Sequence, residues 1–343
     1  MHAGRSVLVS GAAGSIGSIL AQAIAQSSPR RLILLDRSRS RLDSLTREIH
    51  SDSPNVSLVP IVGDICHEPA MDQLFATHQP EVVYHAAAFK HVPQLENDPF
   101  AAIRNNALGT CELAHAAIRH HSQTFVMIST DKAVNPHSIM GATKRIAEMI
   151  LMRGTSGRTS MRALRLGNVL ASRGSVVPIF RRQILQGGPV TVTHPEVRRY
   201  FLTLEEAATL VLAAASRTGN SSILVPRLGS PHKIVDLARY MLARQREIPM
   251  VFTGLRPGEK MAEELTSSCE IVHPDAEREL YRVDHPAEPL IDLGDSIAAL
   301  KRSALENDLV AALRIVRLMV PEFNPSVPLM TLVESQQSRL IRA

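Results

Sequence analysis

The first half of the chain alternates short hydrophobic runs with longer amphipathic stretches. The hydrophobic runs predict buried strands at Val7–Ser10, Leu32–Leu35, Val56–Ile61, Val82–His85, Phe125–Ser129 and Met161–Leu166. Apolar positions recur with helical spacing in the segments between them, at Ile16–Gln26, Arg39–His50, Pro69–His78 and Pro99–His120. Strands that alternate with helices predict βαβ units, so we expect an α/β fold with a Rossmann-like, doubly wound parallel sheet.

The pattern changes after Asn168, where residues 171–178 are rich in Gly, Ser and Pro. Shorter elements follow, predicted at Ile179–Gln186, Val190–Thr193, Thr203–Ala215, Ile223–Val225, Ile234–Leu242 and Met250–Phe252. We therefore expect a first domain over residues 1–170 and a smaller lobe over 171–270, with some chain crossing back to the sheet. Residues 271–343 form an extension of unassigned role, with an extended segment and helices at Asp295–Leu305 and Asp308–Met319.

The composition excludes several classes of protein. A chain of 343 residues can bury a large core, and no apolar run reaches the length needed to span a bilayer. The N-terminus lacks a signal-peptide pattern, so we expect a cytoplasmic protein with no membrane span. Its three cysteines are far apart and its histidines show no metal-ligand spacing, which predicts no disulfide framework and no metal.

The formal charge of +5 is modest, and the basic residues are scattered along the chain. Trp is absent and aromatic residues are few, so platforms for stacking nucleic-acid bases are scarce. We therefore expect no nucleic-acid partner. Arginines in such a chain are better suited to gripping a small diphosphate.

A glycine-rich turn follows the first predicted strand directly. Gly11, Gly14 and Gly17 have the spacing GxxGxxG, and a helix begins with Ser15 and Ile16 inside this motif. Gly11 allows the tight turn, Gly14 lets the backbone approach a pyrophosphate, and Gly17 permits close packing of helix on strand. The turn therefore predicts a dinucleotide site with the phosphates at the helix N-terminus.

Two acidic residues at strand ends extend this site. Asp36 ends the second strand, where a carboxylate binds the adenosine ribose hydroxyls and favours NAD, although the adjacent Arg37 could accommodate NADP. Asp64 and Ile65 follow the third strand near the expected adenine position, but Asp64 could equally cap a turn. The small residues Ala86 and Ala87 at the end of the fourth strand let the dinucleotide lie close.

The fifth strand ends in Thr130, Asp131 and Lys132, at the edge where α/β sheets bind ligands. Ordinary short-chain dehydrogenases carry Tyr-x-x-x-Lys on the next helix, whose i, i+4 spacing places both side chains on one face. This chain has Met140 and Lys144 at that spacing. Met has no exchangeable proton, so another group must serve the substrate hydroxyl, and Met140 alone is as well explained by core packing.

Together these segments resemble the bacterial UDP-N-acetylglucosamine 4,6-dehydratases of polysaccharide biosynthesis, in their short form. These enzymes are extended short-chain dehydrogenases, and longer relatives add membrane helices and a further domain. The resemblance covers about residues 6–265. The matching runs are YHAAAFKHVP at 84–93, RNNALGT at 104–110, STDKAVNP at 129–136, MGATKR at 140–145, RLGNV at 165–169, GSVVP at 174–178, GPVTVTHP at 188–195, RYF at 199–201 and GLRPGEK at 254–260.

The resemblance implies an internal redox cycle on the sugar. Hydride passes from C4 to NAD, water is lost across C5 and C6, and hydride returns to C6, giving a UDP-4-keto-6-deoxy sugar. Asp131 would be the acid for the C6 hydroxyl and Lys132 the base at C5, which requires a lowered pKa for Lys132. Thr130 would bind the C4 hydroxyl, and Lys144 would hold the nicotinamide ribose. Met140 places the chain nearer the branch that retains the C5 configuration.

The resemblance also implies a UDP-sugar site and homo-oligomers. Asn106 would fix a helix or the active-site water network. The expected substrate residues are Lys90, His91, Asn106, Asn168, Val176, Val177, Pro178, Arg199, Arg256 and Glu259. Among these, residues 176–178 offer a slot for uracil and the two arginines suit a diphosphate, with Glu259 orienting Arg256 or binding a ribose hydroxyl. Lys90 and His91 are explained about as well by a solvated loop, and each arginine by an ordinary surface position.

Two other functions stay open from the sequence. A UDP-N-acetylhexosamine epimerase would share the Met at position 140, but it has no use for an acid and a base beside C5 and C6. A non-catalytic NAD(P)-sensing protein would explain the missing Tyr, but it would not require Lys144 or a complete UDP lobe. The Asp131–Lys132 pair therefore favours the dehydratase.

Overall fold

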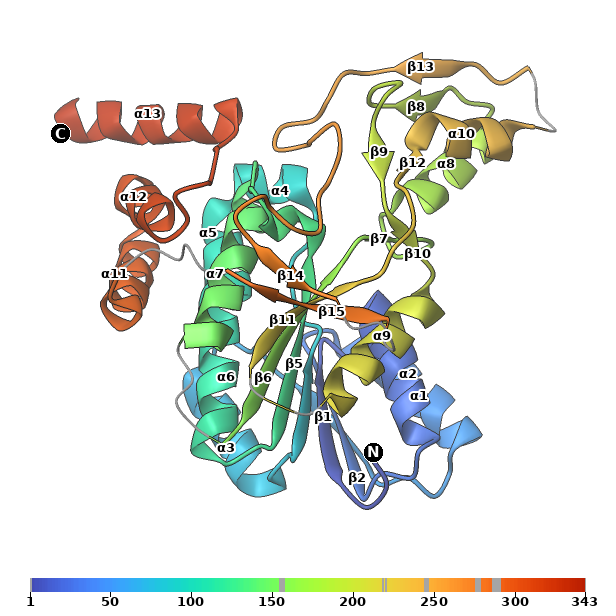
Figure 1. The fold of residues 1–343 in the computed structure, drawn as a ribbon, viewed down its shortest axis with the longest axis vertical. Helices are drawn as coiled ribbons and strands as arrows, with labels where there is room; N and C mark the ends of the chain where they lie inside the picture. Colours follow the sequence, from blue (N-terminus) through green and yellow to red (C-terminus); the bar gives the residue numbers. More distant parts are fainter. Residues whose placement is uncertain are drawn as a thin grey trace.

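A nine-stranded sheet forms the centre of the computed structural model, which describes residues 2–153, 158–217, 219, 221–243, 247–274, 279–285 and 291–342 (Figure 1). The strand order is β14-β15-β11-β6-β5-β4-β1-β2-β3. Neighbouring strands from β3 to β11 pair in parallel. Strand β15 pairs antiparallel with β11, and β14 pairs antiparallel with β15. The strands are β1 (Ser6–Ser10), β2 (Arg31–Asp36), β3 (Leu58–Val62), β4 (Val82–His85), β5 (Thr124–Thr130), β6 (Ser160–Leu166), β11 (Ser222–Pro226), β14 (Ile271–His273) and β15 (Leu280–Asp284).

Helices cover both faces of the sheet, which confirms the predicted Rossmann-like architecture (Figure 1). One face packs against α1 (Ser15–Ala25), α2 (Arg39–Asp52) and α9 (Leu204–Ser216), and the other against α3 (Glu68–His78), α6 (Gly109–Arg119) and α7 (Ile139–Arg153). Alternate residues of β1 serve the two faces: Val7 and Val9 pack with the α1 side, and Leu8 packs with the α3 side. Burial on both faces explains why the strands are continuous hydrophobic runs.

The helix predicted over Pro99–His120 is divided in the structure. It consists of α5 (Pro99–Ala102), a π-helical turn at Ile103–Leu108, and α6. The preceding α4 (Val92–Asn97) was not predicted. The π-helical turn buries the side chains of Asn105 and Asn106 beneath the loop that follows β4. Such turns are frequent at functional sites because they re-aim side chains.

Much of residues 168–253 forms a smaller lobe beside the carboxyl ends of the sheet strands (Figure 1). Its short strands pair as β7 with β10, β8 with β13, and β9 with β12. Phe180, Val190 and Ala238 contribute to its own small core. The chain returns to the main sheet through α9 and β11. The lobe's elements are β7 (Asn168–Val169), α8 (Val176–Leu185), β8 (Val190–Val192), β9 (Arg198–Arg199), β10 (Phe201–Leu202), β12 (His232–Lys233), α10 (Ile234–Leu242) and β13 (Met250–Phe252).

The C-terminal residues form α11 (Leu293–Glu306), α12 (Leu309–Met319) and α13 (Val327–Arg342), of which α13 was not predicted. Asp292 and Asp308 cap the first two helices by accepting hydrogen bonds from backbone N–H groups. Apolar side chains of the three helices share one core cluster with α4, the π-helical turn and α7. This cluster gives the C-terminal extension a structural role against the outer face of α7.

Residues 322–326 contact α7 and the residues just before it. The Asn324 N–H donates to the Pro136 carbonyl at 2.9 Å, and the Arg145 Nε lies 3.6 Å from a Glu322 oxygen. The buried Glu96 carboxylate accepts hydrogen bonds from the Ile139 N–H, at 2.7 Å, and from the Ser326 hydroxyl. The C-terminal segment therefore helps to position the helix that carries Met140 and Lys144. Within the described residues, no helix is both long and apolar enough to cross a membrane.

We expect Leu329→Ala to lower the free energy of unfolding by about 3 kcal/mol, because Leu329 is fully buried in the cluster shared with α7. Urea denaturation measures the change. Leu332→Ala, on the exposed side of the same helix at 38% exposure, should change the stability by less than about 1 kcal/mol. Equal losses in the two variants would contradict the docking of α13 on this cluster.

Candidate active site

The glycine turn between β1 and α1 leaves no room for a side chain at Gly11 or Gly17. Gly11 has a φ of +67°, and a Cβ there would lie 2.6 Å from the Ala87 nitrogen and 2.7 Å from the Ala86 carbonyl carbon. A Cβ on Gly17 would lie 2.1 Å from the Gly11 oxygen. Gly14 precedes α1 without a side-chain cap, so the first N–H groups of the helix remain available to an anion. The turn thus has the shape that a pyrophosphate requires.

Asp36 ties the end of β2 to this turn. Its carboxylate accepts hydrogen bonds from the Ala13 N–H and the Ser38 N–H, each at 2.9 Å. Each oxygen has a second lone pair, which can accept from a ribose hydroxyl. The neighbouring Arg37 lies across the Phe89 ring, with its guanidinium carbon 5.2 Å from the ring centroid, and 3.6 Å from Asp64.

Four other residues expected at the cofactor have partners inside the protein. Asp64 accepts a hydrogen bond from the Cys66 N–H at 2.9 Å, so it caps a turn as well as facing Arg37. The Ile65 side chain is buried in the core beside Gly109. Ser15 accepts a hydrogen bond from the Arg173 N–H at 3.1 Å, and Ile16 packs against the core of the sheet.

Thr130, Asp131 and Lys132 form one hydrogen-bonded group at the carboxyl end of β5. The Lys132 ammonium lies 2.9 Å from Asp131 Oδ1, and the Thr130 hydroxyl donates to the same oxygen at 2.9 Å. Asp131 is fully buried, and its Oδ2 has no hydrogen-bond partner among the described residues. A buried carboxylate oxygen without a donor is costly, so it marks a place where a ligand hydroxyl would be stabilising.

The charge state of Lys132 differs from the sequence-based expectation. Burial by itself would lower the pKa of Lys132, but the negative charges of Asp131 and Glu263 raise it above its ordinary value. The prediction of a lowered pKa is therefore wrong for the protein without substrate. The physical reason is the charge of Asp131, 2.9 Å away, together with that of Glu263, whose Oε1 lies 3.7 Å from the ammonium. Lys132 also donates to Asn168 Oδ1 at 3.0 Å, so Asn168 belongs to the same group.

Lys144 and Met140 lie on α7, both buried. Burial lowers the pKa of Lys144 to about 8. Its charge also lowers the pKa of His85, although burial has the larger effect and brings that pKa to about 3. The His85 ring is held between the hydroxyls of Ser10 and Thr110 at 2.8 and 2.9 Å. Met140 belongs to the apolar cluster shared with the C-terminal helices, which favours packing as its role.

A buried ion-pair network connects the elements that carry the site. Both Glu148 oxygens accept hydrogen bonds from Arg165, at 2.9 and 2.8 Å, and the Ser129 hydroxyl donates to Glu148 at 2.7 Å. Arg165 also donates to both Glu270 oxygens, at 2.9 and 2.7 Å. The network links α7, β5, β6 and the segment before β14. Sequence reasoning missed it because no local pattern relates residues so far apart.

Residues from the loop after β4 face the lobe in part. The Lys90 ammonium donates to the Ser172 hydroxyl at 3.2 Å, and His91 packs against Gly174. Both side chains are therefore placed between the sheet and the lobe. Asn106 instead has no exposed surface and holds the Phe89 backbone with both of its amide atoms, at 2.8 and 2.9 Å. Asn106 thus positions this loop, and its place among the substrate residues stays a prediction.

The two arginines expected to bind a diphosphate differ sharply. Arg199 is buried and donates to the carbonyls of residues 198, 260 and 261 and to Glu259. These donors hold the loop at 254–263, and a phosphate role for Arg199 stays a prediction. Arg256 is exposed on that loop, and its backbone N–H donates to Glu259. Glu259 thus braces the loop that carries Arg256. Val176, Val177 and Pro178 are half-buried at the start of α8.

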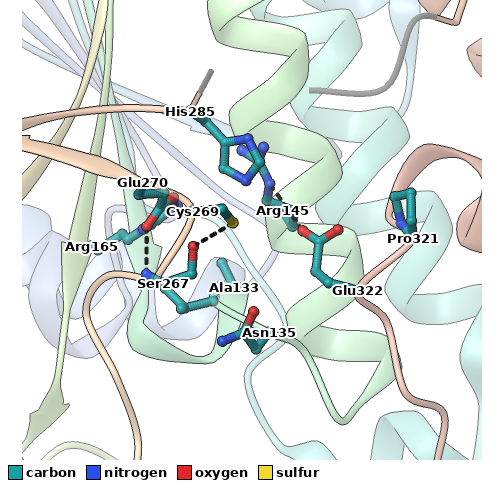
Figure 2. Close-up of a pocket in the computed structure, with 11 residues that line it drawn as sticks. Ala133, Asn135, Arg145, Arg165, Ser267, Cys269, Glu270, His285, Pro321 and Glu322 are labelled. Carbon is teal, nitrogen blue, oxygen red and sulfur yellow. Dashed lines mark hydrogen bonds and ion pairs between the residues drawn. The ribbon is translucent and has the colours of Figure 1, made fainter. Parts of the chain in front are cut away.

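A cavity of about 170 Å³ lies behind the catalytic segment (Figure 2). Ala133 and Val134, directly after Lys132, form part of its wall, but none of the predicted site residues lines it. Figure 2 shows Arg145 facing Glu322, and Arg165 beside Glu270, so the charges around the cavity balance. The cavity is therefore separate from the place where the predicted residues gather.

Sequence reasoning also missed Glu263, which lies beside Lys132, and Lys260, which lies beside Glu263. Lys260 is the last residue of the GLRPGEK run, and Glu263 follows that run by three residues. The Lys260 ammonium donates to the Val134 carbonyl at 2.6 Å and lies 3.9 Å from Glu263. Within the described part of the chain, no cluster of three or more His, Cys, Asp or Glu side chains has a geometry suited to a metal ion.

Relatives of the chain are found among polysaccharide biosynthesis proteins. It is 44% identical to the capsular polysaccharide biosynthesis protein CapD of Staphylococcus aureus, over 84% of this chain and 50% of that protein. It is 46% identical to the probable polysaccharide biosynthesis protein EpsC of Bacillus subtilis, over 78% of this chain and 46% of that protein. The chain thus spans about half the length of these two relatives.

Two further proteins align with this chain over most of the length of both. A UDP-glucose 4-epimerase of Rickettsia rickettsii is 33% identical over 82% of this chain and 84% of that protein. The X-ray structure of Pen from Bacillus thuringiensis superposes with a TM-score of 0.76 and 28% identity, covering 83% of this chain and 90% of that one. The profile of the family described as polysaccharide biosynthesis protein matches residues 7–285. The chain therefore belongs to this polysaccharide biosynthesis family of extended short-chain dehydrogenases.

Proposed function

We propose that this protein is an NAD-dependent 4,6-dehydratase of UDP-N-acetylglucosamine or a related UDP-hexosamine. The observation that carries the proposal is the ion pair of Lys132 with the buried Asp131 at the carboxyl end of β5, where one carboxylate oxygen has no donor among the described residues. Water loss across C5 and C6 needs an acid at one carbon and a base at the other. An acid and a base already in contact meet that need. The family membership adds a place for the product in surface polysaccharide or glycan synthesis.

The dinucleotide would lie over the glycine turn, with its phosphates at the N-terminus of α1 and its adenosine ribose at Asp36. When bound there, NAD would supply the acceptor and donor of the hydride that the redox cycle requires. Arg37 is engaged by Asp64 and Phe89, which favours NAD over NADP because the guanidinium is not directed at a 2′-phosphate. Lys144 of α7 would hold the nicotinamide ribose.

The ion pair contains the protons that the reaction needs. When one proton passes from Lys132 Nζ to Asp131 Oδ1, along their 2.9 Å hydrogen bond, the ion pair becomes an amine and a carboxylic acid. The amine then takes the C5 proton, and the acid protonates the departing C6 hydroxyl, which leaves as water. Lys132 ends as a cation and Asp131 as an anion. Lys132 would then return a proton to C5 as C6 receives the hydride, and the proton lost from the C4 hydroxyl would replace it on Lys132, so the resting pair is restored. Thr130 would bind the C4 hydroxyl, since its own hydroxyl adjoins this pair.

The substrate would bind between the sheet and the lobe. Arg256 is the candidate for the diphosphate, because its guanidinium is exposed and guanidinium forks match phosphate oxygens. Residues 176–178 would contact uracil, and Lys90 and His91 would border the sugar. Met140, in place of a proton-carrying Tyr, supports retention of the C5 configuration. We further infer that the protein works as a homo-oligomer in the cytoplasm.

A UDP-hexose 4-epimerase is the second candidate, favoured by the 33% identity to the Rickettsia rickettsii protein of that name. An epimerase needs proton transfer only at the C4 hydroxyl. It would leave the buried Asp131–Lys132 pair without a task at C5 and C6. The pair therefore favours the dehydratase.

We expect Gly17→Ala to weaken NAD binding about tenfold or more, because its Cβ would meet the Gly11 carbonyl and strain the turn by about 1–3 kcal/mol. Calorimetric titration with NAD measures the affinity, and circular dichroism checks that the variant is folded. Gly229→Ala is the control, because nothing lies within 4 Å of a Cβ at that position. Unchanged affinity in Gly17→Ala would remove the dinucleotide from this turn.

Mass spectrometry of UDP-N-acetylglucosamine after incubation with the protein and NAD tests the reaction. We expect a product lighter by one water. An unchanged mass with a new sugar signal in the NMR spectrum would instead establish an epimerase. Bound NAD without any change in several UDP-hexoses would favour a non-catalytic sensor.

The variant Lys132→Ala tests the residue assigned as the base in this reaction. Its rate of water loss should fall by about 10²–10⁴-fold, because the base at C5 is gone. Oxidation at C4 should stay detectable as reduced-nicotinamide absorbance, since that step does not use Lys132. Full dehydratase activity in this variant would exclude Lys132 as the base.

A further inference from the structure

Glu263 is the second carboxylate beside Lys132, and no motif of the sequence singles it out. Its side chain is 2% exposed, and its Oε1 lies 3.7 Å from the Lys132 ammonium. Its other oxygen has no hydrogen-bond partner among the described residues and lies 3.9 Å from the Lys260 ammonium. Glu264, the next residue in the chain, is exposed and accepts a hydrogen bond from Asn135 at 3.2 Å. The two neighbouring glutamates therefore have opposite environments.

We propose that Glu263 is a positioning residue for Lys132, which holds the ammonium beside Asp131 and opposes the loss of its proton. This inference rests on the proposed function, because it concerns the residue that we assign as the base. A buried anion within 4 Å of a cation favours the charged form of that cation. Glu263 thus keeps the pair in its resting, ionic state until substrate reaches the site.

The charges around Lys132 come from several elements. Asp131 precedes it at the end of β5, Lys260 ends the 254–260 run, Glu263 follows that run, and Arg199 belongs to β9. Asp131 and Glu263 stabilise the ammonium, and Arg199 and Lys260 act against it. Burial lowers the pKa of Lys260, and Lys132 lowers it further, although the surrounding carboxylates raise it. Two carboxylates and two ammonium groups thus alternate along this buried row.

Glu263 also faces groups outside the row. His137, before α7, feels its negative charge, which raises the pKa of that imidazole, although burial dominates and lowers it. The backbone beside Glu263 is anchored to the lobe, because Ala262 pairs with Arg198 and the Arg199 guanidinium holds the carbonyls of residues 260 and 261. The anchoring makes the position of Glu263 depend on the loop that carries Arg256. Glu263 therefore connects the candidate diphosphate loop to the protonation of the base.

Competitive acetylation of Lys132, followed by peptide mass spectrometry over a range of pH, tests this inference without requiring turnover. The Lys132 side chain is 22% exposed, so a small reagent can reach it. In Glu263→Gln the midpoint of labelling should move to lower pH by about one unit or more, because an anion beside the ammonium is removed. Glu263→Asp keeps the charge and should stay closer to the wild-type midpoint than Glu263→Gln does. Glu264→Gln is the control, with an unchanged midpoint.

The pH profile of water loss gives a second readout. Its rise with pH should also move to lower pH in Glu263→Gln, whereas a lower rate with an unmoved profile and labelling midpoint would show a merely structural role and overturn the inference. A moved labelling midpoint in a protein that releases no water would uphold Glu263 while the dehydratase proposal fails. If Glu263→Gln does not fold, Lys260→Gln should raise the midpoint, because the charge of Glu263 then acts on Lys132 alone. An unchanged midpoint there would contradict the inference.

Discussion

The buried ion pair between Glu148 and Arg165 is the interaction on which the geometry of the site depends. Charges removed from water are stable only when they are paired and fully hydrogen-bonded, and removing one partner of such a pair costs about 3–5 kcal/mol. Here Glu148 of α7 accepts from Ser129 of β5 and from Arg165 of β6, and Arg165 continues to Glu270. Ser129 directly precedes the catalytic group, so a shift of this pair would displace it. The C-terminal segment also holds α7, through Glu322 on Arg145 and through Ser326 on the Glu96 carboxylate.

The catalytic group itself is a small set of balanced charges. Asp131 and Glu263 offset Lys132 and Lys260, so the site can be buried without an unpaired charge. A proton that moves within such a set need not be exchanged with bulk water at every step. This arrangement suits an internal redox cycle, in which the same residues give and take protons and return to their starting state. Because Lys132 can pass its proton to Asp131 within this set, a raised pKa of Lys132 in the protein without substrate is compatible with its proposed role as a base.

The parallel part of the sheet could be predicted from the sequence because its strands are buried on both faces and so form continuous hydrophobic runs. Strand β4 was predicted with its observed bounds, and the other parallel strands of the Rossmann core within two residues. The π-helical turn could not be found from periodicity, because it lies inside a segment whose spacing favours one helix throughout. Helices α4 and α13 were missed for a similar reason, since their stability comes from the shared cluster with α7 more than from their own sequences.

Site residues could be predicted where one local motif determines their geometry. They could not be predicted where contacts between residues distant in the chain determine it. The glycine turn and the Asp131–Lys132 pair follow from local sequence. Arg199 and Arg256 are both arginines in matched runs, and only the structure shows that backbone carbonyls occupy Arg199. Part of the upward pKa shift of Lys132 comes from Glu263, which is remote in the chain.

The central claim is that the Asp131–Lys132 pair exchanges the proton at C5. Turnover of UDP-N-acetylglucosamine with NAD in D₂O, followed by proton NMR of the sugar, tests it most directly. We predict that the product carries deuterium at C5, because Lys132 removes that proton and solvent replaces it. A product that keeps its original hydrogen at C5 would contradict the account, because a reaction confined to C4 never breaks that bond.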